Sequence, residues 1–225
     1  MPDRAVIFDL DGTLVDTAPD LMRATNHVLE ALGRRPIGMD EVRSFVGHGA
    51  RSLLTRGLAA TGGLPENYDV EPDYERFVAF YSRNIAGGSV PFPGLVSLLE
   101  RLQREGVAMA VCTNKLEGLS NQLLDALDLA KYFGAVVGPD TLGIAKPDPR
   151  PFREAVARLG LAGPRALMVG DSETDILTAR NAGVPVIAVP FGYTPRPVAE
   201  FGPDRLIGHF DEAYEAIQDL LPPNP

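Results

Sequence analysis

Short runs of apolar residues recur along the chain, each followed by polar or glycine-containing segments. Such runs, bounded by turn residues, are typical of strands that are buried on both faces. The first run, AVIF at Ala5–Phe8, ends at Asp9, and the glycine after Asp11 marks its stop. The other predicted strands are VAMAVC (107–112), AVVG (135–138), ALMVG (166–170) and PVIAVPFG (185–192).

Amphipathic segments lie between the later apolar runs. Apolar residues recur every three or four positions there, which is the spacing of a helix with one buried face. These segments are GLVSLLERLQRE (94–105), EGLSNQLLDAL (117–127), PFREAVARLG (151–160) and ETDILTARNAG (173–183). Strands that alternate with helices predict an α/β fold, with an open, mostly parallel, Rossmann-like doubly wound sheet and helices on both of its faces.

One long segment breaks this alternation, because only helical patterns follow Asp16 for several tens of residues. The first helix is expected to start near Asp16, with Pro19 in its first turn and Gly33 as its stop. Further helical patterns occupy MDEVRSFV, ARSLLTRGLAA and PDYERFVAFYSRNI. The sequence therefore predicts a helical insert at 16–89 within an α/β core formed by 1–15 and 90–225.

Composition places the chain among globular proteins and narrows its partners. The chain has 225 residues, of which 45% are hydrophobic and 23% charged, and carries a formal net charge of −9 with a pI near 4.8. The acidic balance argues against binding to nucleic acid or to anionic membranes. No apolar run reaches membrane-spanning length and no signal peptide is evident. Because Cys112 is the only cysteine, we expect a cytoplasmic protein without disulfides.

Polar residues gather where the predicted strands end. In an open α/β sheet, ligands bind beyond the carboxyl ends of the strands. Those ends and one nearby loop offer carboxylates, hydroxyls, an amide and two lysines: Asp9, Asp11, Thr113, Asn114, Lys115, Lys146, Asp171 and Ser172. A single Asp after a strand is more often a turn former or a helix N-cap. Their accumulation at one rim of the sheet indicates a functional site instead.

The acids at this rim require a compensating positive charge. Two ionised carboxylates about 4 Å apart repel by roughly 4 kcal/mol at the effective dielectric of a protein surface. A magnesium ion shared by Asp9 and Asp171 would remove such repulsion, since Mg²⁺ takes oxygen ligands and commonly uses one or two carboxylates. Ligand type alone leaves Mn²⁺ open. An EF-hand is excluded because Leu14 occupies the position of its glycine, and no P-loop motif is present.

Four short motifs then occur in a characteristic order. DLDGT, TN, KP and GDSETD resemble the four motifs of the haloacid dehalogenase-like hydrolases, and the helical insert is similar to that family's small α-helical cap. The resemblance covers nearly the whole chain. It implies a sheet in the order 5-4-1-2-3 and an Mg²⁺-dependent mechanism through an aspartyl-phosphate. FVGHGAR, TNK, VGDSETDI and PFGY resemble the phosphoglycolate phosphatases of this family in particular.

The resemblance implies a role for each residue that matches a motif. Asp9 attacks phosphorus and forms the aspartyl-phosphate, which divides one difficult step into two. Asp11 protonates the departing oxygen and later takes a proton from water, and its backbone carbonyl binds the metal. Lys146 and Mg²⁺ neutralise the approach of a carboxylate to a phosphate dianion.

The remaining motif residues are implied to hold the phosphate and the metal. Thr113 and the backbone of Asn114 donate hydrogen bonds to phosphoryl oxygens, and Asp171 binds the metal. Asp175, one helical turn later, is expected to order a metal-bound water or to pair with the loop lysine. Ser172 has two open interpretations, as the N-cap of the following helix or as a partner behind the metal ligands.

The helical insert is expected to select the substrate by closing over the core. SFVGHGARSLL places Gly47, His48 and Gly49 on a turn between helices, followed by Arg51. Backbone amides of such a turn can approach an anion, and Arg51 can bind a carboxylate or phosphate through two hydrogen bonds. The alternative is a plain turn with solvated side chains. The resemblance to phosphoglycolate phosphatases implies hydrolysis of 2-phosphoglycolate to glycolate and phosphate, and this small acid phosphate suits a cationic contact.

Related chemistries leave alternatives open. An inorganic pyrophosphatase or another sugar-phosphate phosphatase shares most of these features. A dehalogenase is disfavoured because such enzymes generally lack the acid present at Asp11. A phosphomutase is disfavoured because the insert has no lysine and only His27 and His48 as histidines, and a non-enzymatic binding module because every motif acid and the lysine are present. The expected partner is a small phosphorylated metabolite, and the chain is expected to be a monomer or a homodimer.

Overall fold

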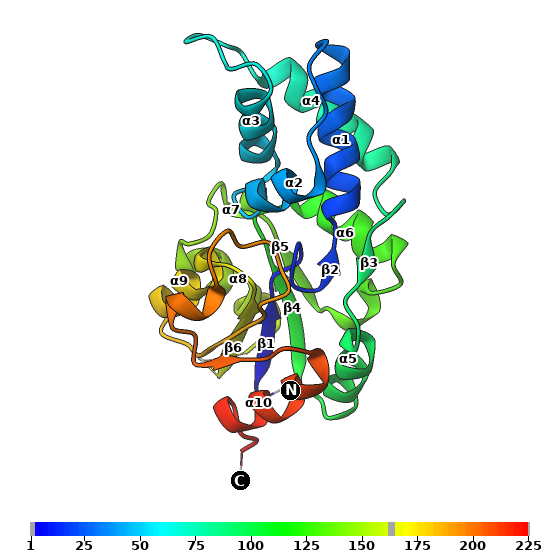
Figure 1. Cartoon of the computed structure of the whole chain (residues 1–225). Helices are drawn as coiled ribbons and strands as arrows, with labels where there is room; N and C mark the ends of the chain where they lie inside the picture. The colour runs from blue at the N-terminus through cyan, green and yellow to red at the C-terminus, as the bar shows by residue number, and fades with distance from the viewer. Residues whose placement is uncertain (1–2, 162–164, 225) are drawn as a thin grey trace.

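A six-stranded parallel sheet forms the centre of the protein in this computed structural model, which describes residues 3–161 and 165–224 (Figure 1). Every pairing between neighbouring strands of the sheet is parallel. The strands follow one another across the sheet as β5 (Ala135–Val137), β4 (Ala108–Cys112), β1 (Ala5–Phe8), β6 (Ala166–Gly170), β7 (Val186–Ala188) and β8 (Arg205–Leu206). The resemblance predicted the order 5-4-1-2-3. If the five predicted strands β1, β4, β5, β6 and β7 are numbered 1 to 5 along the chain, the sheet has this order when read from β7 to β5. The order is therefore confirmed, and β8 is added beyond β7.

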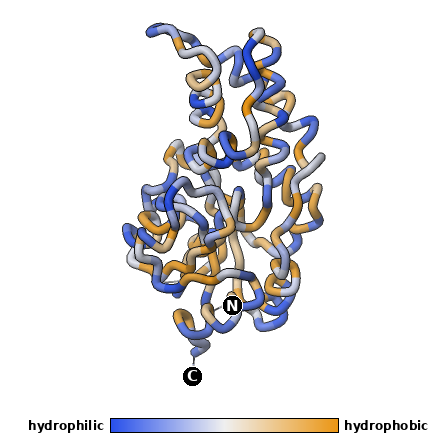
Figure 2. Tube along the Cα trace, viewed as in Figure 1, coloured by the Kyte–Doolittle hydropathy of each residue, from blue (hydrophilic) through white to orange (hydrophobic). Residues whose placement is uncertain are grey.

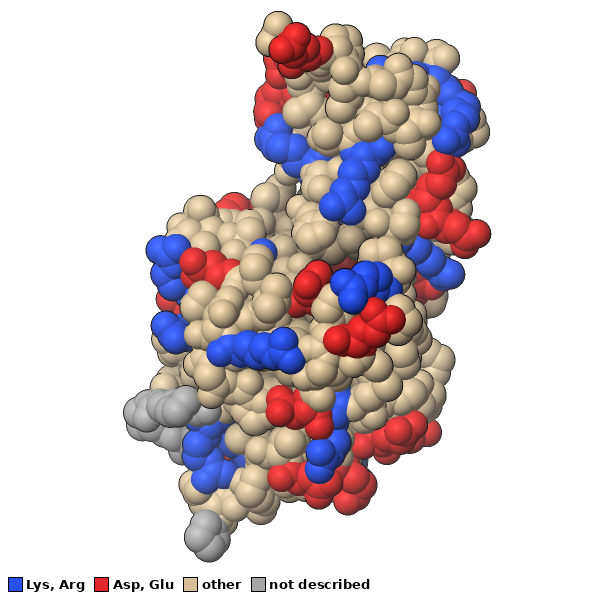
Figure 3. All heavy atoms as spheres, turned by 60° about the vertical axis from the view of Figure 1, so that its left-hand side comes forward, with Lys and Arg blue, Asp and Glu red and all other residues tan. Residues whose placement is uncertain are grey.

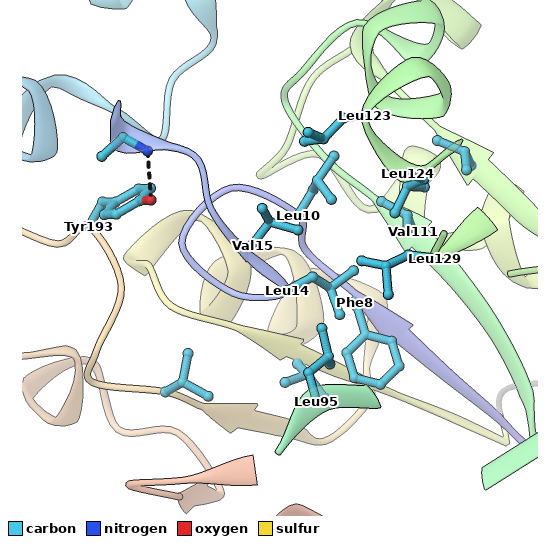
Figure 4. Close-up of a cluster of buried hydrophobic side chains, with 14 of the residues drawn as sticks. Phe8, Leu10, Leu14, Val15, Leu95, Val111, Leu123, Leu124, Leu129 and Tyr193 are labelled. Atoms are coloured by element: carbon cyan, nitrogen blue, oxygen red, sulfur yellow. Dashed lines mark hydrogen bonds between the residues drawn. The ribbon is translucent and has the colours of Figure 1, made fainter. Parts of the chain in front are cut away.

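The central strand β1 explains why both faces of the sheet are covered. Its four residues are fully buried and alternate between two hydrophobic clusters. Val6 and Phe8 belong to one cluster, shown in part in Figure 4, and Ala5 and Ile7 belong to the other. The hydropathy colouring of Figure 2 accordingly shows the strands as predominantly apolar segments inside a more polar exterior.

Helices pack on both faces of the sheet and contribute side chains to the two clusters. On the Phe8 face lie α5 (Leu95–Arg104), α6 (Glu117–Ala126) and α10 (Ala213–Leu220). On the Ile7 face lie α8 (Pro149–Arg158) and α9 (Glu173–Ala182). The predicted α/β architecture with helices on both faces is therefore confirmed. A short helix, α7 (Pro139–Leu142), precedes the loop that carries Lys146.

Four helices stand beyond the carboxyl end of the sheet and form a helical unit of their own (Figure 1). The first of them, α1, contacts the other three. The four helices are α1 (Ala18–Ala31), α2 (Met39–Phe45), α3 (Ala50–Ala60) and α4 (Glu71–Arg83). The small α-helical cap expected from the sequence is thus present, and its exact domain boundaries stay a prediction.

A two-stranded antiparallel ribbon joins the helical unit to the core. Its strands, β2 (Val15–Asp16) and β3 (Val90–Pro91), lie just before and just after the four helices along the chain. The carboxylate of Asp20 in α1 also accepts hydrogen bonds from the backbone of Gly88, at 3.0 Å, and of Ser89, at 2.8 Å. The chain therefore leaves the core and returns to it through one double connection, which holds the helical unit over the ends of the strands.

Candidate active site

The strand ends meet at one rim because the sheet register aligns them. Phe8 lies opposite Val111 of β4 and Val169 of β6, so the residues that follow each strand emerge at the same level. Above this rim the structure forms one cavity of about 680 Å³, with the helical unit as its roof. Most of the predicted site residues line it: Asp9, Asp11, Gly47, His48, Arg51, Thr113, Asn114, Lys146 and Ser172.

Lys146 lines this cavity, and its side chain is 2% exposed. Its ammonium nitrogen Nζ is 2.8 Å from Oδ1 of Asp9 and 2.6 Å from Oδ1 of Asp175. Burial by itself would lower the pKa of Lys146, but the two carboxylates, Asp175 first and then Asp9, raise that pKa above its ordinary value. The side chain is therefore a permanent cation in contact with the predicted nucleophile.

The loop that carries Lys146 is fastened to the end of β4. Asn114 accepts the backbone N–H of Lys146 at Oδ1, at 2.9 Å, and donates from Nδ2 to the carbonyl oxygen of the same residue, at 3.3 Å. Its Nδ2 also donates to the carbonyl oxygen of Gly47 at 3.1 Å. The Asn114 side chain thus ties the lysine loop and the turn of the helical unit to one strand end, which leaves its backbone for the predicted phosphate contact.

Asp9, Asp171 and Asp175 form an acidic cluster whose oxygens lie within 4.8 Å of one another, and all three are buried. Burial raises the pKa of Asp9 to about 6, although Lys146 acts in the opposite direction. Burial and the neighbouring carboxylates of Asp175 and Asp9 also raise the pKa of Asp171 well above its ordinary value. Such an all-oxygen donor set fits a hard divalent cation, which would offset the repulsion among the acids.

Two residues that are far apart in the sequence, Thr13 and Tyr193, hold the carboxylate of Asp171. Oδ1 accepts the hydroxyl of Thr13 at 3.0 Å, and Oδ2 accepts the backbone N–H of Tyr193 at 2.6 Å. The Tyr193 hydroxyl in turn accepts the backbone N–H of Ala18 at 2.9 Å, the dashed line in Figure 4. These contacts orient a carboxylate that, by prediction, binds the metal. The motifs DLDGT and PFGY include Thr13 and Tyr193, but they do not predict that both residues contact Asp171.

Ser172 and Asp175 are bonded to each other at the start of α9. Asp175 Oδ2 accepts both the backbone N–H of Ser172, at 3.1 Å, and its hydroxyl, at 2.6 Å. Ser172 therefore occupies the N-cap position and also contacts a member of the acidic cluster, so the two interpretations are compatible. Asp175 pairs with Lys146, as one of the two expectations for it required.

Asp11 has a different lysine partner from Asp9. Lys115 Nζ lies 3.0 Å from Oδ1 and 3.2 Å from Oδ2 of Asp11, and it donates to the hydroxyl oxygen of Tyr81 in α4 at 2.7 Å. Burial favours neutral Lys115, but Asp11 and Tyr81 raise its pKa above the ordinary value. The sequence placed Lys115 at this rim without assigning it a role. Its position directly after Thr113 and Asn114 was the available signal.

The residues of the helical unit that are predicted to contact the substrate line the cavity, and Arg51 among them already has protein partners. Arg51 pairs with Glu71, with 3.1 Å between its second terminal nitrogen and Oε1, and its guanidinium lies 4.2 Å from the ring centroid of Tyr74. Its side chain is 50% exposed. The backbone at Gly49 passes so close to the core that a Cβ atom there would be 3.1 Å from the carbonyl oxygen of Asn114. The substrate roles of this turn stay predictions.

Comparison with known families identifies the fold and its motifs. The model of the haloacid dehalogenase-like hydrolases matches residues 6–189, which span the strand ends, the helical unit and the lysine loop. The chain belongs to this family. The resemblance inferred from the four motifs is therefore confirmed.

Relatives with curated names narrow the class within this family. A phosphoglycolate phosphatase of Caulobacter vibrioides is 48% identical over 216 residues, which cover 96% of this haloacid dehalogenase-like chain and 91% of the relative. A phosphoglycolate phosphatase of Mesorhizobium japonicum is 45% identical over 96% of this chain and 95% of its own length. These relatives confirm the predicted class of enzyme, a phosphoric monoester hydrolase.

Solved structures agree with this assignment of the fold. A protein from Haemophilus somnus described as a predicted phosphoglycolate phosphatase superimposes with a TM-score of 0.89 at 30% identity, covering 96% of this chain and 98% of its own. CbbY from Rhodobacter sphaeroides, solved in complex with phosphate, superimposes with a TM-score of 0.79 at 27% identity, covering 94% and 96%.

Charged side chains are spread over the face of the protein shown in Figure 3. Acidic and basic side chains are interspersed there, without an extended basic area. Among the described residues, no helix is both long enough and apolar enough to cross a bilayer.

Proposed function

We propose that the chain is a Mg²⁺-dependent phosphatase that hydrolyses 2-phosphoglycolate to glycolate and phosphate through an aspartyl-phosphate on Asp9. The observation that carries this proposal is the contact of Asp9 with Lys146 beside the buried carboxylates of Asp171 and Asp175. A carboxylate that attacks a phosphate needs this concentration of cations and metal ligands around it. The relatives named phosphoglycolate phosphatase support the choice of substrate.

The metal would be held by Asp9 and Asp171, together with the backbone carbonyl of Asp11. The residues present fit this group, since among the described residues of the rim four carboxylates, including Asp175, meet two lysine ammonium groups. When bound, Mg²⁺ supplies positive charge that offsets the repulsion between the nucleophile and the phosphate dianion. Thr13 and the backbone of Tyr193 keep the Asp171 carboxylate directed toward this position.

In the first half of the reaction, a bond forms between a carboxylate oxygen of Asp9 and phosphorus, and the bond from phosphorus to the glycolate oxygen breaks. Asp11 donates a proton to that oxygen, so glycolate leaves with a hydroxyl group. Lys146 stays beside Asp9 and stabilises the negative charge that gathers on the phosphoryl oxygens. Thr113 and the backbone N–H of Asn114 hold those oxygens at the end of β4.

In the second half, water attacks the phosphorus of the aspartyl-phosphate. Asp11, now ionised, takes a proton from this water, and the bond between phosphorus and the Asp9 oxygen breaks. Phosphate departs and both carboxyl groups return to their starting states. The helical unit at 16–89 acts as a cap in this scheme, since closing it over the rim excludes bulk water from the reacting groups. We further propose that the enzyme acts in the cytoplasm, as a monomer or a homodimer.

Release of phosphate from a panel of metabolites tests the proposal. The panel contains 2-phosphoglycolate, pyrophosphate and a pentulose bisphosphate, each assayed with Mg²⁺ and with EDTA, and with Asp9→Asn beside the wild type. The bisphosphate is included because CbbY was also solved with xylulose-1,5-bisphosphate. We expect Mg²⁺-dependent turnover of 2-phosphoglycolate that Asp9→Asn abolishes. Faster turnover of another member would retain the mechanism and change the substrate. Turnover that persists with EDTA or in the variant would refute the mechanism.

A further inference from the structure

We propose that Lys115 recognises the carboxylate of the substrate and, in doing so, releases Asp11 for its role as proton donor. This inference rests on the proposed function and makes it more specific. It assigns the chemical class of substrate as phosphoesters whose leaving group carries a carboxylate next to the ester carbon. It also identifies Lys115 as a specificity-determining residue and Tyr81 as the residue that positions it.

Lys115 is placed as a binding group and not as a surface charge. Its side chain is 5% exposed, lines the cavity and contacts the Asp11 carboxylate and the Tyr81 hydroxyl. Phosphate chemistry does not need it, because Lys146 already contacts the nucleophile. A buried ammonium group carries a large desolvation cost, which a purely structural pair offsets only in part. Its location inside the cavity therefore points to a ligand.

The proposed role of Asp11 as proton donor places the substrate carboxylate near Lys115. The proton donor must lie within hydrogen-bond reach of the leaving oxygen, so the leaving group occupies the space beside Asp11. Lys115 Nζ is 3.0 Å from the same carboxylate. In 2-phosphoglycolate the carboxylate carbon is separated from the ester oxygen by one methylene group, which puts its oxygens about 3 Å from the leaving oxygen at ordinary bond lengths. The substrate carboxylate thus falls within reach of the lysine.

The other cations of the cavity are engaged elsewhere. Lys146 contacts two buried carboxylates of the chain itself. Arg51 pairs with Glu71 through two hydrogen bonds and is half exposed, and His48 is exposed. Among the cavity-lining residues that the structure describes, Lys115 is the buried cation with one carboxylate partner, and that partner is the group that must be freed for catalysis.

An exchange of partners connects recognition with catalysis. An ammonium group has three N–H donors, and Lys115 directs them to both Asp11 oxygens and to Tyr81. A substrate carboxylate can replace Asp11 while the Tyr81 hydroxyl, fixed in α4, continues to hold the lysine. The Asp11 oxygens then turn to the leaving group. A phosphoester without a carboxylate leaves the pair of Lys115 and Asp11 intact, and its leaving oxygen has no free donor.

The test compares two substrates that differ in the carboxylate alone. The value of kcat/KM is measured for 2-phosphoglycolate and for 2-hydroxyethyl phosphate, and their ratio defines the selectivity. Hydrogen bonds to charged groups contribute enough to change rates by about 10- to 100-fold. We expect Lys115→Met to lower the selectivity by this factor. Lys131→Met is the matched control, because Lys131 lies on the surface beside Asp128, and its selectivity is expected to equal that of the wild type.

Tyr81→Phe provides a second measurement of the selectivity, which does not depend on whether Lys115→Met folds. It removes only the oxygen that positions Lys115, and we expect the selectivity to fall about threefold or more, whereas Tyr214→Phe, at an exposed hydroxyl, leaves it unchanged. Wild-type selectivity in either Lys115→Met or Tyr81→Phe would overturn the inference while the proposed function stands. A wild type that hydrolyses phosphoesters but not 2-phosphoglycolate would overturn the substrate and the inference together.

Discussion

Gly192 leaves no room for a side chain beside Asp171, since a Cβ atom on Gly192 would lie 2.5 Å from the carboxyl carbon of Asp171. The approach brings the next amide, that of Tyr193, within 2.6 Å of the same carboxylate. The segment after β7 therefore acts as a support that fixes one of the proposed metal ligands. Residues that orient a ligand commonly change metal affinity or activity by about 10- to 100-fold when they are altered.

Gly192→Ala is expected to displace Asp171 and to weaken Mg²⁺ binding and phosphatase activity by about 10-fold or more. Calorimetric titration with Mg²⁺ and a phosphate-release assay measure the two effects. Gly118→Ala is the control, because a Cβ atom at Gly118, in α6, meets no atom within 4 Å. If Gly192→Ala matched the control in both measurements, the segment would have no part in holding the metal ligand.

Lys146→Met removes the ammonium group that faces two buried carboxylates. Loss of one partner from a buried charge pair is expected to lower the free energy of unfolding by about 3 kcal/mol, and loss of a charge-stabilising donor to lower kcat by about 100- to 1,000-fold. Urea unfolding and steady-state kinetics measure these quantities. Mg²⁺ is expected to restore part of the stability, since it supplies charge to Asp9.

Lys131→Met again serves as the control, because Lys131 lies on the surface and pairs with exposed Asp128. Exposed pairs contribute about 1 kcal/mol or less. An equal unfolding midpoint for Lys146→Met and Lys131→Met would show that the buried carboxylates do not depend on the lysine.

Binding of Mg²⁺ is expected to stabilise the folded protein. A ligand at 100 times its Kd adds about 2.7 kcal/mol to the free energy of unfolding, which raises the Tm of a domain of this size by about 5–10 °C. A thermal unfolding series with increasing Mg²⁺, and with EDTA as reference, measures the shift. Asp171→Asn is expected to abolish it, whereas Asp128→Asn, at an exposed carboxylate, is expected to retain it. A shift of equal size in Asp171→Asn would place the metal elsewhere.

Much of this arrangement could be predicted because its signals are local. The run Ala5–Phe8 is apolar throughout, which identifies a strand covered on both faces, and the parallel topology then brings Asp9, Thr113 and Asp171 to one rim. The helix at Ala50–Ala60 was delimited correctly, since glycine precedes it and a polar segment follows. The strand predicted at 185–192 is shorter, Val186–Ala188, because Pro190 cannot donate a ladder hydrogen bond.

The contacts that sequence reasoning missed are those that depend on how separate elements meet. Lys115 and Asp11 are 104 positions apart, and Tyr81 joins them only because the folded chain brings α4 within hydrogen-bond distance of Lys115. No periodicity in the sequence encodes such a contact. Likewise, the sequence predicts Arg51 as an anion-binding residue but does not predict that Glu71, in the next helix, accepts two of its hydrogen bonds.

Asp20 anchors the return of the chain from the helical unit to the core. Its side chain is 1% exposed and accepts hydrogen bonds from the backbone of Gly88 and from the backbone and hydroxyl of Ser89, and it pairs with Arg23. Burial by itself would raise the pKa of Asp20, but the hydrogen bonds from Ser89 and Arg23 hold this pKa below its ordinary value of 3.8.

The stabilisation from Asp20 must therefore depend on pH in a defined direction. A carboxyl group whose pKa is lower in the folded state contributes fully above its unfolded pKa, near 3.8, and loses this contribution as the pH falls through the folded value. Asp20→Asn is expected to lower the free energy of unfolding by about 2 kcal/mol at pH 7, with a difference from the wild type that shrinks below about pH 4. Urea unfolding between pH 7 and pH 3 measures it, with exposed Asp40→Asn as the control. A deficit that is constant over this range would mean that the shape of the Asp20 side chain, and not its charge, holds the connection.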